Sequence, residues 1–362
     1  MRAQLPNIKY LHIVRGLAAV LVVFFHAKYV FWVGGTIYKA DIGLHTIQDY
    51  LLFSLDMMSS CGKECVIVFF ILSAFVIKYS YGDQQGKWGS FYKIRALRIY
   101  LPFLFSLIFS IIVLAVCIHY INPAIYTDNL REYNSRLFKA YNEFSFGQVI
   151  KTVFFIEQGE FSGANYAYWS LGHELIFYLL FPLYNLFDTV KKYMAAVLFI
   201  CLFLLTGLQV FYYQVFFIGG LLLYDYFAKE ATKPVIKNKL IYIGLLVLLF
   251  IAVNISNRAI SEKFSDIVTL FYSFFIFDYI LHFVRKENKP WMKLGDISYT
   301  LYLNHLPLLL IFYSFITKLK GRLVFYDRGP YYLGVLFALI LAIPLYYLVE
   351  KPSINLIKKL RR

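Results

Sequence analysis

The sequence predicts an all-α, polytopic membrane protein with about ten transmembrane helices and both termini in the cytoplasm. Three observations predict this class. Charged residues make up only 16% of the chain, and hydrophobic residues 60%, whereas soluble domains carry about 25% charged residues. Apolar runs of about 20 residues, the length that crosses a ~30 Å hydrocarbon core, recur along the chain. Lys and Arg cluster in short connections, so the net charge of +15 indicates membrane topology and not nucleic-acid binding.

Ten apolar runs are long enough to form helices, and polar residues flank each of them. We expect the helices at residues 11–32, 64–80, 97–119, 168–187, 193–208, 210–228, 237–254, 266–284, 297–317 and 331–350. The second could begin earlier, because residues 50–58 are also apolar. The fifth and sixth are separated only by a tight turn near Gln209.

The distribution of Lys and Arg predicts the side of the membrane on which each connection between helices lies. Ten spans place both termini on one side, and the connections on that side carry 22 Lys and Arg residues against 13 on the other. Cytoplasmic connections are the ones enriched in these residues. We therefore expect residues 1–362 to form one multi-pass domain in a bacterial cytoplasmic membrane. The long connection 120–167 lies outside, as either a lid or binding element or an interfacial helix.

Arg15 and His26 stand out among the ionisable residues of the first apolar run. Such residues are costly in a bilayer and usually face a bundle interior or an aqueous cavity. They are eleven residues apart, about three helical turns, so they share one face roughly 16 Å apart along the axis. This face holds a cation near the cytoplasm and an imidazole in the outer half. The alternative is a snorkelling Arg with a packing His.

Six blocks in this sequence resemble motifs of the integral-membrane acyltransferase 3 family, in the expected order. They are R-G-L-A-A-V-L-V-V-F-F-H (15–26), F-F-I-L-S-A-F-V-I (69–77), R-A-L-R-I-Y-L-P (95–102), W-S-L-G-H-E-L-I-F-Y-L-L-F-P (169–182), S-Y-T-L-Y-L-N-H (298–305) and V-E-K-P (349–352). The resemblance covers the whole chain, with Ala74 where Gly is usual. It implies transfer of an acyl group, usually acetyl from acetyl-CoA, to a hydroxyl of a cell-surface glycan or related acceptor.

Three residues are the candidate catalytic groups. His26 is the expected general base or transient acyl carrier, because imidazole accepts a proton near neutral pH. Glu174 lies one turn into an apolar helix and needs a partner, for which His26 or Arg15 are the candidates. It could orient His26, or form a structural ion pair. Arg15 could contact the donor or stabilise negative charge, or serve only as an interfacial anchor.

The acyl-CoA is expected as a donor substrate and not as a tightly bound cofactor. Arg95 and Arg98, on one helix face at the cytoplasmic side, together with Arg15, suit its phosphates. The alternative for the Arg95–Arg98 pair is topology or contact with anionic lipid. No Gly-rich phosphate loop is present, and the four cysteines form no metal pattern. Cys61 and Cys65 could pair, or pack as thiols.

Six further residues are candidate substrate contacts. They are Ser73, Trp169, His173, Tyr299, Tyr302 and His305. Ser298, Tyr302 and His305 form a stripe on one helix face, and Tyr299 lies beside it. For His305 a packing role next to Pro307 is an alternative. For Ser73 the alternative is close helix packing, and for Glu350 we expect a structural ion pair.

The partners expected are acyl-CoA, a glycan or lipid-linked glycan, and the bilayer. Some members of the family carry a fused extracytoplasmic hydrolase-like domain. This chain ends at Arg362, so we expect none, and either this domain acts alone or a separate periplasmic protein completes the transfer. The chief alternative is a transporter or flippase for a lipid-linked glycan, since buried Arg, His and Glu also suit proton coupling. A non-catalytic scaffold of a polysaccharide export machine is the second alternative.

Overall fold

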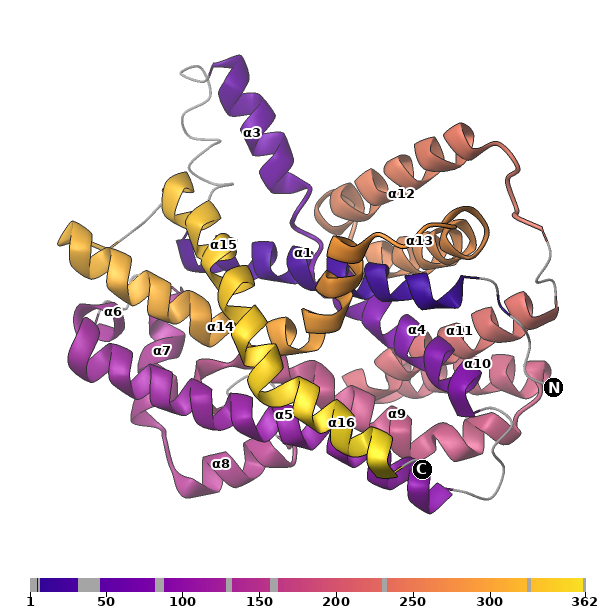
Figure 1. Cartoon of the computed structure of the whole chain (residues 1–362), viewed down its shortest axis with the longest axis horizontal. Helices are drawn as coiled ribbons and strands as arrows, with labels where there is room; N and C mark the ends of the chain where they lie inside the picture. Colours follow the sequence, from indigo (N-terminus) through magenta and orange to yellow (C-terminus); the bar gives the residue numbers. More distant parts are fainter. Residues whose placement is uncertain are drawn as a thin grey trace. The chain divides into compact units, whose positions relative to one another are not determined.

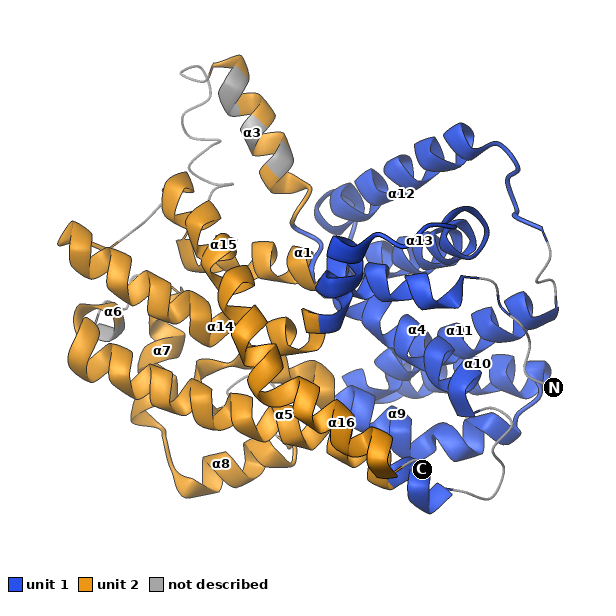
Figure 2. Cartoon of the chain, in the orientation of Figure 1, with its two compact units in different colours: residues 1–18, 60–92, 173–296 blue, residues 19–59, 93–172, 297–362 orange. Residues whose placement is uncertain are grey.

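Every regular element in the described residues is a helix (Figure 1). The structure, a computed structural model, describes residues 5, 7–31, 46–81, 88–127, 132–156, 162–229, 233–323 and 327–360. The chain divides into two compact units (Figure 2). Unit 1 comprises residues 1–18, 60–92 and 173–296, and unit 2 comprises residues 19–59, 93–172 and 297–362. The predicted all-α class is confirmed.

Ten long helices correspond to the ten predicted runs. They are α1 (Leu11–Phe31), α4 (Gly62–Tyr81), α5 (Trp88–Val116), α9 (Trp169–Leu186), α10 (Thr189–Thr206), α11 (Gln209–Lys229), α12 (Lys239–Ala259), α13 (Glu262–Phe283), α14 (Lys289–Lys320) and α15 (Arg328–Leu345). The shorter helices are η1 (Ile8–Tyr10), α3 (Ile47–Met57), η2 (Cys117–Ile121), α6 (Ala124–Thr127), α7 (Glu132–Asn142), α8 (Phe146–Val153), η3 (Ser162–Ala164), η4 (Tyr166–Tyr168), η5 (Tyr346–Glu350) and α16 (Lys351–Leu360).

Nine helices within the described ranges are long and apolar enough to cross a membrane, by length and composition. The remaining predicted span is α9, which carries His173 and Glu174 in its first two turns and is not among the nine. The predicted polytopic membrane class is confirmed. The orientation of the termini stays a prediction.

The apolar stretch before the second span forms a helix of its own. α3 ends at Met57 and α4 begins at Gly62, so the second span does not extend back to residue 50. The backbone carbonyl of Asp56 is the point of interruption, because it accepts from Ser59 Oγ (2.9 Å) and from the ammonium of Lys28 on α1. These side chains and the Ser59 backbone N–H (3.4 Å) thus replace the helical partner of this carbonyl.

Unit 1 is held together by close contacts between helices. α4 packs against α11 and α13, α12 pairs with α13, and α10 pairs with α11 across the predicted tight turn, where Gly207 has φ +70°. Gly220 of α11 lies against α4 so closely that a Cβ there would come within 2.2 Å of the Ile71 carbonyl oxygen and 2.9 Å of the Ala74 Cβ. Ala74 stands where Gly is usual in the block 69–77, and at this contact the glycine is Gly220 of the facing helix.

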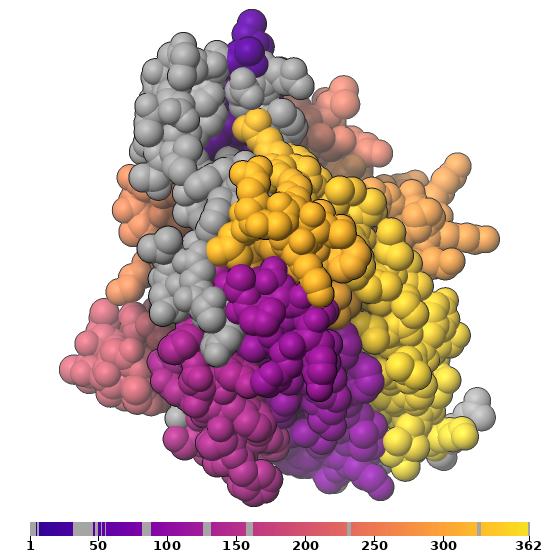
Figure 3. Space-filling model, turned by 90° about the vertical axis from the view of Figure 1, so that its left-hand side faces the viewer, coloured from indigo at the N-terminus to yellow at the C-terminus, as the bar shows by residue number. Residues whose placement is uncertain are grey.

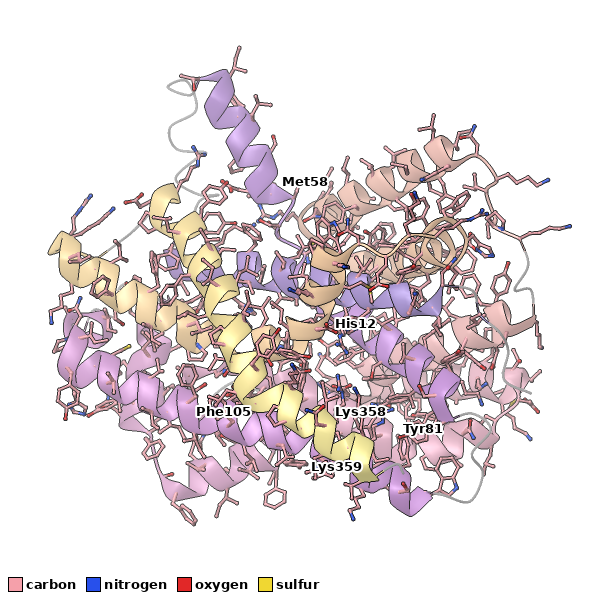
Figure 4. The ribbon with its side chains drawn as sticks, viewed as in Figure 1. His12, Met58, Tyr81, Phe105, Lys358 and Lys359 are labelled. Atoms are coloured by element: carbon pink, nitrogen blue, oxygen red, sulfur yellow. The ribbon has the colours of Figure 1, made fainter. Side chains whose placement is uncertain are left out.

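Unit 2 contains the connection 120–167, whose described residues are largely helical. Figure 3 shows the face on which the C-terminal ends of α5 and α14 meet. There Asn122 Nδ2 donates to Thr317 Oγ1 (3.0 Å). Near the other end of α5, Ser353 of α16 donates to the Leu97 carbonyl (3.4 Å). Lys358 and Lys359, labelled in Figure 4, are exposed near the end of α16.

Candidate active site

Two histidines meet inside unit 2. α1 brings His26 and α14 brings His305, and His305 Nε2 lies 2.8 Å from His26 Nδ1. The imidazole rings are stacked, with centroids 4.8 Å apart and planes inclined by 28°. His305 is fully buried, whereas His26 is half-buried. The sequence predicted both as site residues, but it did not predict that they contact each other.

The hydrogen bonds of the pair define where the protons lie. His305 Nδ1 is 2.7 Å from the Tyr302 carbonyl oxygen and 3.3 Å from that of Leu301. A carbonyl only accepts, so this nitrogen carries the proton, and Nε2 of neutral His305 is an acceptor. His26 Nδ1 must therefore donate to it. This network assigns a bare lone pair to Nε2 of neutral His26, which is the form a general base needs.

Pro307 removes one backbone hydrogen bond of α14 close to the histidine pair. Proline has no N–H, so the carbonyl of Leu303, four residues earlier, has lost its helical partner. This oxygen accepts from Ser106 Oγ of α5 (2.8 Å) and from Asn165 Nδ2 (2.8 Å). The Tyr168 hydroxyl lies 2.8 Å from the same Ser106 Oγ. The proline therefore provides an acceptor that ties α5 and the segment before α9 to α14.

The segment before α9 has an unusual backbone. Gly163 and Ala164 both have left-handed conformations, with φ +76° and +56°. A Cβ at Gly163 would lie 2.7 Å from backbone and side-chain atoms of Ser110, so only glycine fits here. Ala164 costs about 1–2 kcal/mol in this conformation. The buried hydrogen bonds of Asn165 offset that cost and fix the position of Tyr166.

Two tyrosines and an arginine lie near His26. Tyr166 presents an edge-on contact to the His26 ring, with centroids 5.3 Å apart, and Tyr29 contacts Tyr166 at 5.9 Å. Arg136 of α7 places its guanidinium 5.8 Å from the Tyr29 centroid and 5.1 Å from that of Tyr166. Glu132 accepts from Arg136 at 2.9 Å. We call Tyr29, Tyr166 and Arg136 the aromatic wall.

The sequence did not single out the aromatic wall. Tyr29 follows His26 by three residues, so helical spacing alone could have identified it. Tyr166 precedes the block 169–182 by three residues, and its role depends on the fold of the 162–168 segment. Arg136 has no local signal, because only the tertiary structure brings the α7 segment to α1.

Other predicted residues of unit 2 have structural contacts. The Tyr302 hydroxyl donates to the Ala167 carbonyl (2.9 Å) and lies 2.7 Å from Ser170 Oγ. Trp169 and Tyr299 pack against a buried apolar cluster, and the Tyr299 hydroxyl also donates to a backbone carbonyl of α5 (3.3 Å). These contacts join α14 to α9 and α5. A substrate contact for Trp169, Tyr299 or Tyr302 stays a prediction.

The predicted phosphate site contains an ion pair. Arg98 Nη2 lies 3.7 Å from Oε1 of the buried Glu350, in agreement with the structural pair expected for that carboxylate. The other oxygen of Glu350 accepts from the Thr300 backbone N–H (3.1 Å) and hydroxyl (2.6 Å). Arg98 is 28% exposed and Arg95 is half-buried, so both are near the surface of unit 2.

Glu174 lies in unit 1 with two hydroxyl partners. Its Oε1 accepts from Ser73 Oγ of α4 (2.9 Å) and from the Tyr178 hydroxyl, one turn further along α9. Ser73 therefore contacts a candidate catalytic carboxylate, which its small size alone did not predict. His173 is buried against the rings of Phe70 (6.4 Å) and Tyr213 (4.6 Å). A substrate contact for His173 stays a prediction.

Arg15 contacts the start of α14 within unit 1. Its Nη2 donates to the Gly295 carbonyl (3.0 Å), and one turn earlier His12, labelled in Figure 4, lies 2.8 Å from Asp296 Oδ1. A Cβ on Gly16 would lie 2.8 Å from the Gly295 nitrogen. Arg15 therefore has an anchoring contact, and its expected contact with the donor stays a prediction.

The structure brings together some of the predicted site residues. His26 and His305 are in contact in unit 2, and Glu174 and Ser73 are in contact in unit 1. Because Glu174 belongs to unit 1 and His26 to unit 2, the predicted alignment of the carboxylate with His26 stays a prediction. Over the described part of the chain, no three His, Cys, Asp or Glu side chains are grouped to hold a metal ion. Cys61 and Cys65 are buried, with Sγ atoms 3.9 Å apart.

The fold and the site define a class, an all-helical membrane protein with two histidines in contact, in which one imidazole nitrogen has a lone pair that can accept a proton. Comparison with models of protein families matches residues 8–351 to the acyltransferase domain of the acyltransferase 3 family. The match covers most of the chain, so the chain belongs to this family and is a membrane acyltransferase. No curated protein and no solved structure matches the chain.

Proposed function

We propose that this chain is an O-acyltransferase that moves an acyl group, acetyl in the first instance, from acyl-CoA to a hydroxyl of a cell-surface or exported glycan. Membership of the family supports acyl transfer. One observation supports the chemistry in particular, namely that His305 holds the proton of His26 on Nδ1 and leaves Nε2 available as a base.

The reaction that suits this geometry is direct transfer. The glycan hydroxyl gives its proton to His26 Nε2 while its oxygen attacks the carbonyl carbon of the thioester. The new C–O bond forms, the C–S bond breaks, and the proton passes from His26 to the departing thiolate of CoA. His305 accepts a hydrogen bond from the imidazolium of His26 throughout, which stabilises the charge that develops there.

The donor is expected to enter from the cytoplasm. Arg95 and Arg98 lie near the start of α5 and can offer guanidinium groups to the phosphates of acetyl-CoA. Arg15 is proposed to contact the donor between these residues and His26, and Glu174 to help orient the reacting groups. In this arrangement both termini are cytoplasmic and the connection 120–167 is outside. The acceptor would be presented from the outer side or on a lipid carrier, and either this domain acts alone or a separate periplasmic protein completes the transfer.

Replacement of His26 by Ala tests the proposal. Membranes from cells that express the chain are incubated with acetyl-CoA that is radiolabelled in the acetyl group, and alkali-labile label is measured, because O-acetyl esters are cleaved by alkali. We expect H26A to insert normally and to lose the label, since no other side chain has the assigned lone pair at that position. His119→Ala is the matched control, because His119 is an exposed histidine in η2, directly after α5, and its Nε2 lies 2.6 Å from the Tyr141 hydroxyl.

The outcomes separate the proposal from its rivals. Loss of transfer in H26A with full transfer in H119A supports an acyltransferase that uses His26. Normal transfer in H26A would refute the proposed role of His26 as base or carrier. No alkali-labile acetyl in the wild-type membranes or in their glycans, examined by mass spectrometry, would refute acetyl transfer to a hydroxyl.

A further inference from the structure

The hydroxyl group of Tyr166 stands out among the polar atoms near His26. Its oxygen is buried and has no hydrogen-bond partner among the described residues. Nearly all buried polar groups in proteins are hydrogen-bonded, because a group that leaves water without a new partner destabilises the fold. A buried hydroxyl without a protein partner beside a candidate catalytic base therefore indicates a group that a substrate completes.

The backbone holds Tyr166 in a fixed position relative to His305. On one side of it, Asn165 Nδ2 donates to the Leu303 carbonyl (2.8 Å), and on the other the Ala167 carbonyl accepts from the Tyr302 hydroxyl (2.9 Å). Both bonds end on the turn of α14 that precedes His305. The Tyr166 ring then meets the His26 ring edge-on at 5.3 Å. The position is determined before any ligand binds, as catalytic hydrogen-bond donors require.

Tyr166 remains protonated in this environment. Burial holds the pKa of Tyr166 well above its ordinary value, even though the Arg136 guanidinium opposes that shift from 5.1 Å above the ring. A phenol that keeps its proton cannot act as the base, and it is a poor general acid. It can donate a strong hydrogen bond, particularly to an oxygen that gains negative charge.

We propose that the Tyr166 hydroxyl donates a hydrogen bond to the carbonyl oxygen of the acyl group during transfer. This inference rests on the proposed function. When the glycan hydroxyl attacks, the C=O electrons move onto that oxygen, and its charge is greatest in the tetrahedral intermediate. When the C–S bond breaks, the C=O bond re-forms. Tyr166 keeps its own proton in both steps, while the proton of the glycan hydroxyl travels through His26 to the CoA sulfur.

Tyr166→Phe removes only the hydroxyl and keeps the ring contacts with His26 and Arg136. We expect kcat for acetyl transfer to fall by about 10²–10³-fold, the effect of losing one oxyanion donor. The KM for acetyl-CoA should change by less than threefold, because the bond strengthens mainly in the transition state. The thermal unfolding midpoint should be equal to or above that of the wild type, since the lost hydroxyl has no partner within the described structure.

Tyr168→Phe is the matched control. Tyr168 lies two residues further along the same short helix, but its hydroxyl is hydrogen-bonded at 2.8 Å to Ser106 and 3.1 Å to Ser110. We expect the opposite pattern, a lower unfolding midpoint with kcat within threefold of the wild type. The two Tyr→Phe changes therefore distinguish a hydroxyl used in catalysis from one used in folding.

Three results would overturn the inference. They are a kcat of Y166F within threefold of the wild type, a rise in KM with kcat unchanged, and an unfolding midpoint that falls as far as in Y168F. The second would assign Tyr166 to substrate binding and the third to structure. If H26A is inactive while Y166F is fully active, only this inference fails. If H26A is active, the proposed role of His26 fails, whatever Y166F shows. If the wild type transfers no acetyl group, the proposed function fails.

Discussion

His305 should determine the rate of transfer although it is not the base. In His305→Ala the imidazolium that forms on His26 loses the acceptor that now lies 2.8 Å from Nδ1. A hydrogen bond to a charged group contributes about 1.5–3 kcal/mol, and each 1.36 kcal/mol is a factor of ten in rate. We therefore expect kcat for acetyl transfer to fall by roughly 10–150-fold, with the KM for acetyl-CoA nearly unchanged. Initial rates at saturating acetyl-CoA measure this.

Two further variants separate the hydrogen bond from the packing of His305. His305→Gln retains an acceptor oxygen near the position of Nε2. We therefore expect kcat of H305Q to be at least tenfold higher than kcat of H305A. Leu308→Ala opens a comparable cavity in α14, where Leu308 is 2% exposed, and should lose about 2–5 kcal/mol of stability with little change in kcat. The reasoning is refuted if kcat of H305A stays within twofold of the wild type, or if L308A lowers kcat as much as H305A does.

Two other predictions concern the donor site and the packing of α1. Arg98→Ala should raise the KM for acetyl-CoA by roughly 10–150-fold, because a charge-assisted hydrogen bond to phosphate is lost. Glu350→Gln should leave this KM unchanged. Equal effects of the two changes on KM in steady-state assays would assign Arg98 to structure alone. Gly16→Ala should destabilise unit 1 by about 1–3 kcal/mol, because its Cβ would lie 2.8 Å from the Gly295 nitrogen. Gly244→Ala, with no atom within 4 Å of the new Cβ, should be neutral or stabilising, and equal unfolding midpoints for these two Ala variants would contradict this.

The sequence predicted the helices well because a bilayer constrains local composition strongly. A span must be apolar over about 20 residues, whatever it packs against, so the signal lies within the segment itself. The same constraint identified His26, since an imidazole within such a run is costly without a function or a partner. The helix α9 shows the limit of this signal, because His173 and Glu174 lower its apolarity and it is not among the nine helices that are long and apolar enough to cross a membrane.

The contacts of the site could not be predicted in the same way. His26 and His305 are 279 residues apart in the chain, and neither sequence block carries information about the distance between them. The 162–168 segment was expected only as part of a connection, because its left-handed residues include Ala164, which no turn rule favours at positive φ. Tyr166 owes its position to this backbone, so a prediction from the sequence missed it.

Pro307 shows how a residue with an ordinary local explanation acquires a role in the site. From the sequence, the proline offered only a packing explanation for its neighbour His305. In the structure it frees the Leu303 carbonyl, which takes hydrogen bonds from Ser106 and from Asn165. The bond from Asn165 fixes the backbone next to Tyr166, while the Tyr302 carbonyl, one residue before Leu303, accepts from His305. Adjacent carbonyls on one turn of α14 thus orient Tyr166 and His305, the two groups that contact the His26 ring. A change at Pro307 that restores the helical N–H would compete for the Leu303 carbonyl and would therefore weaken the positioning of the Tyr166 hydroxyl.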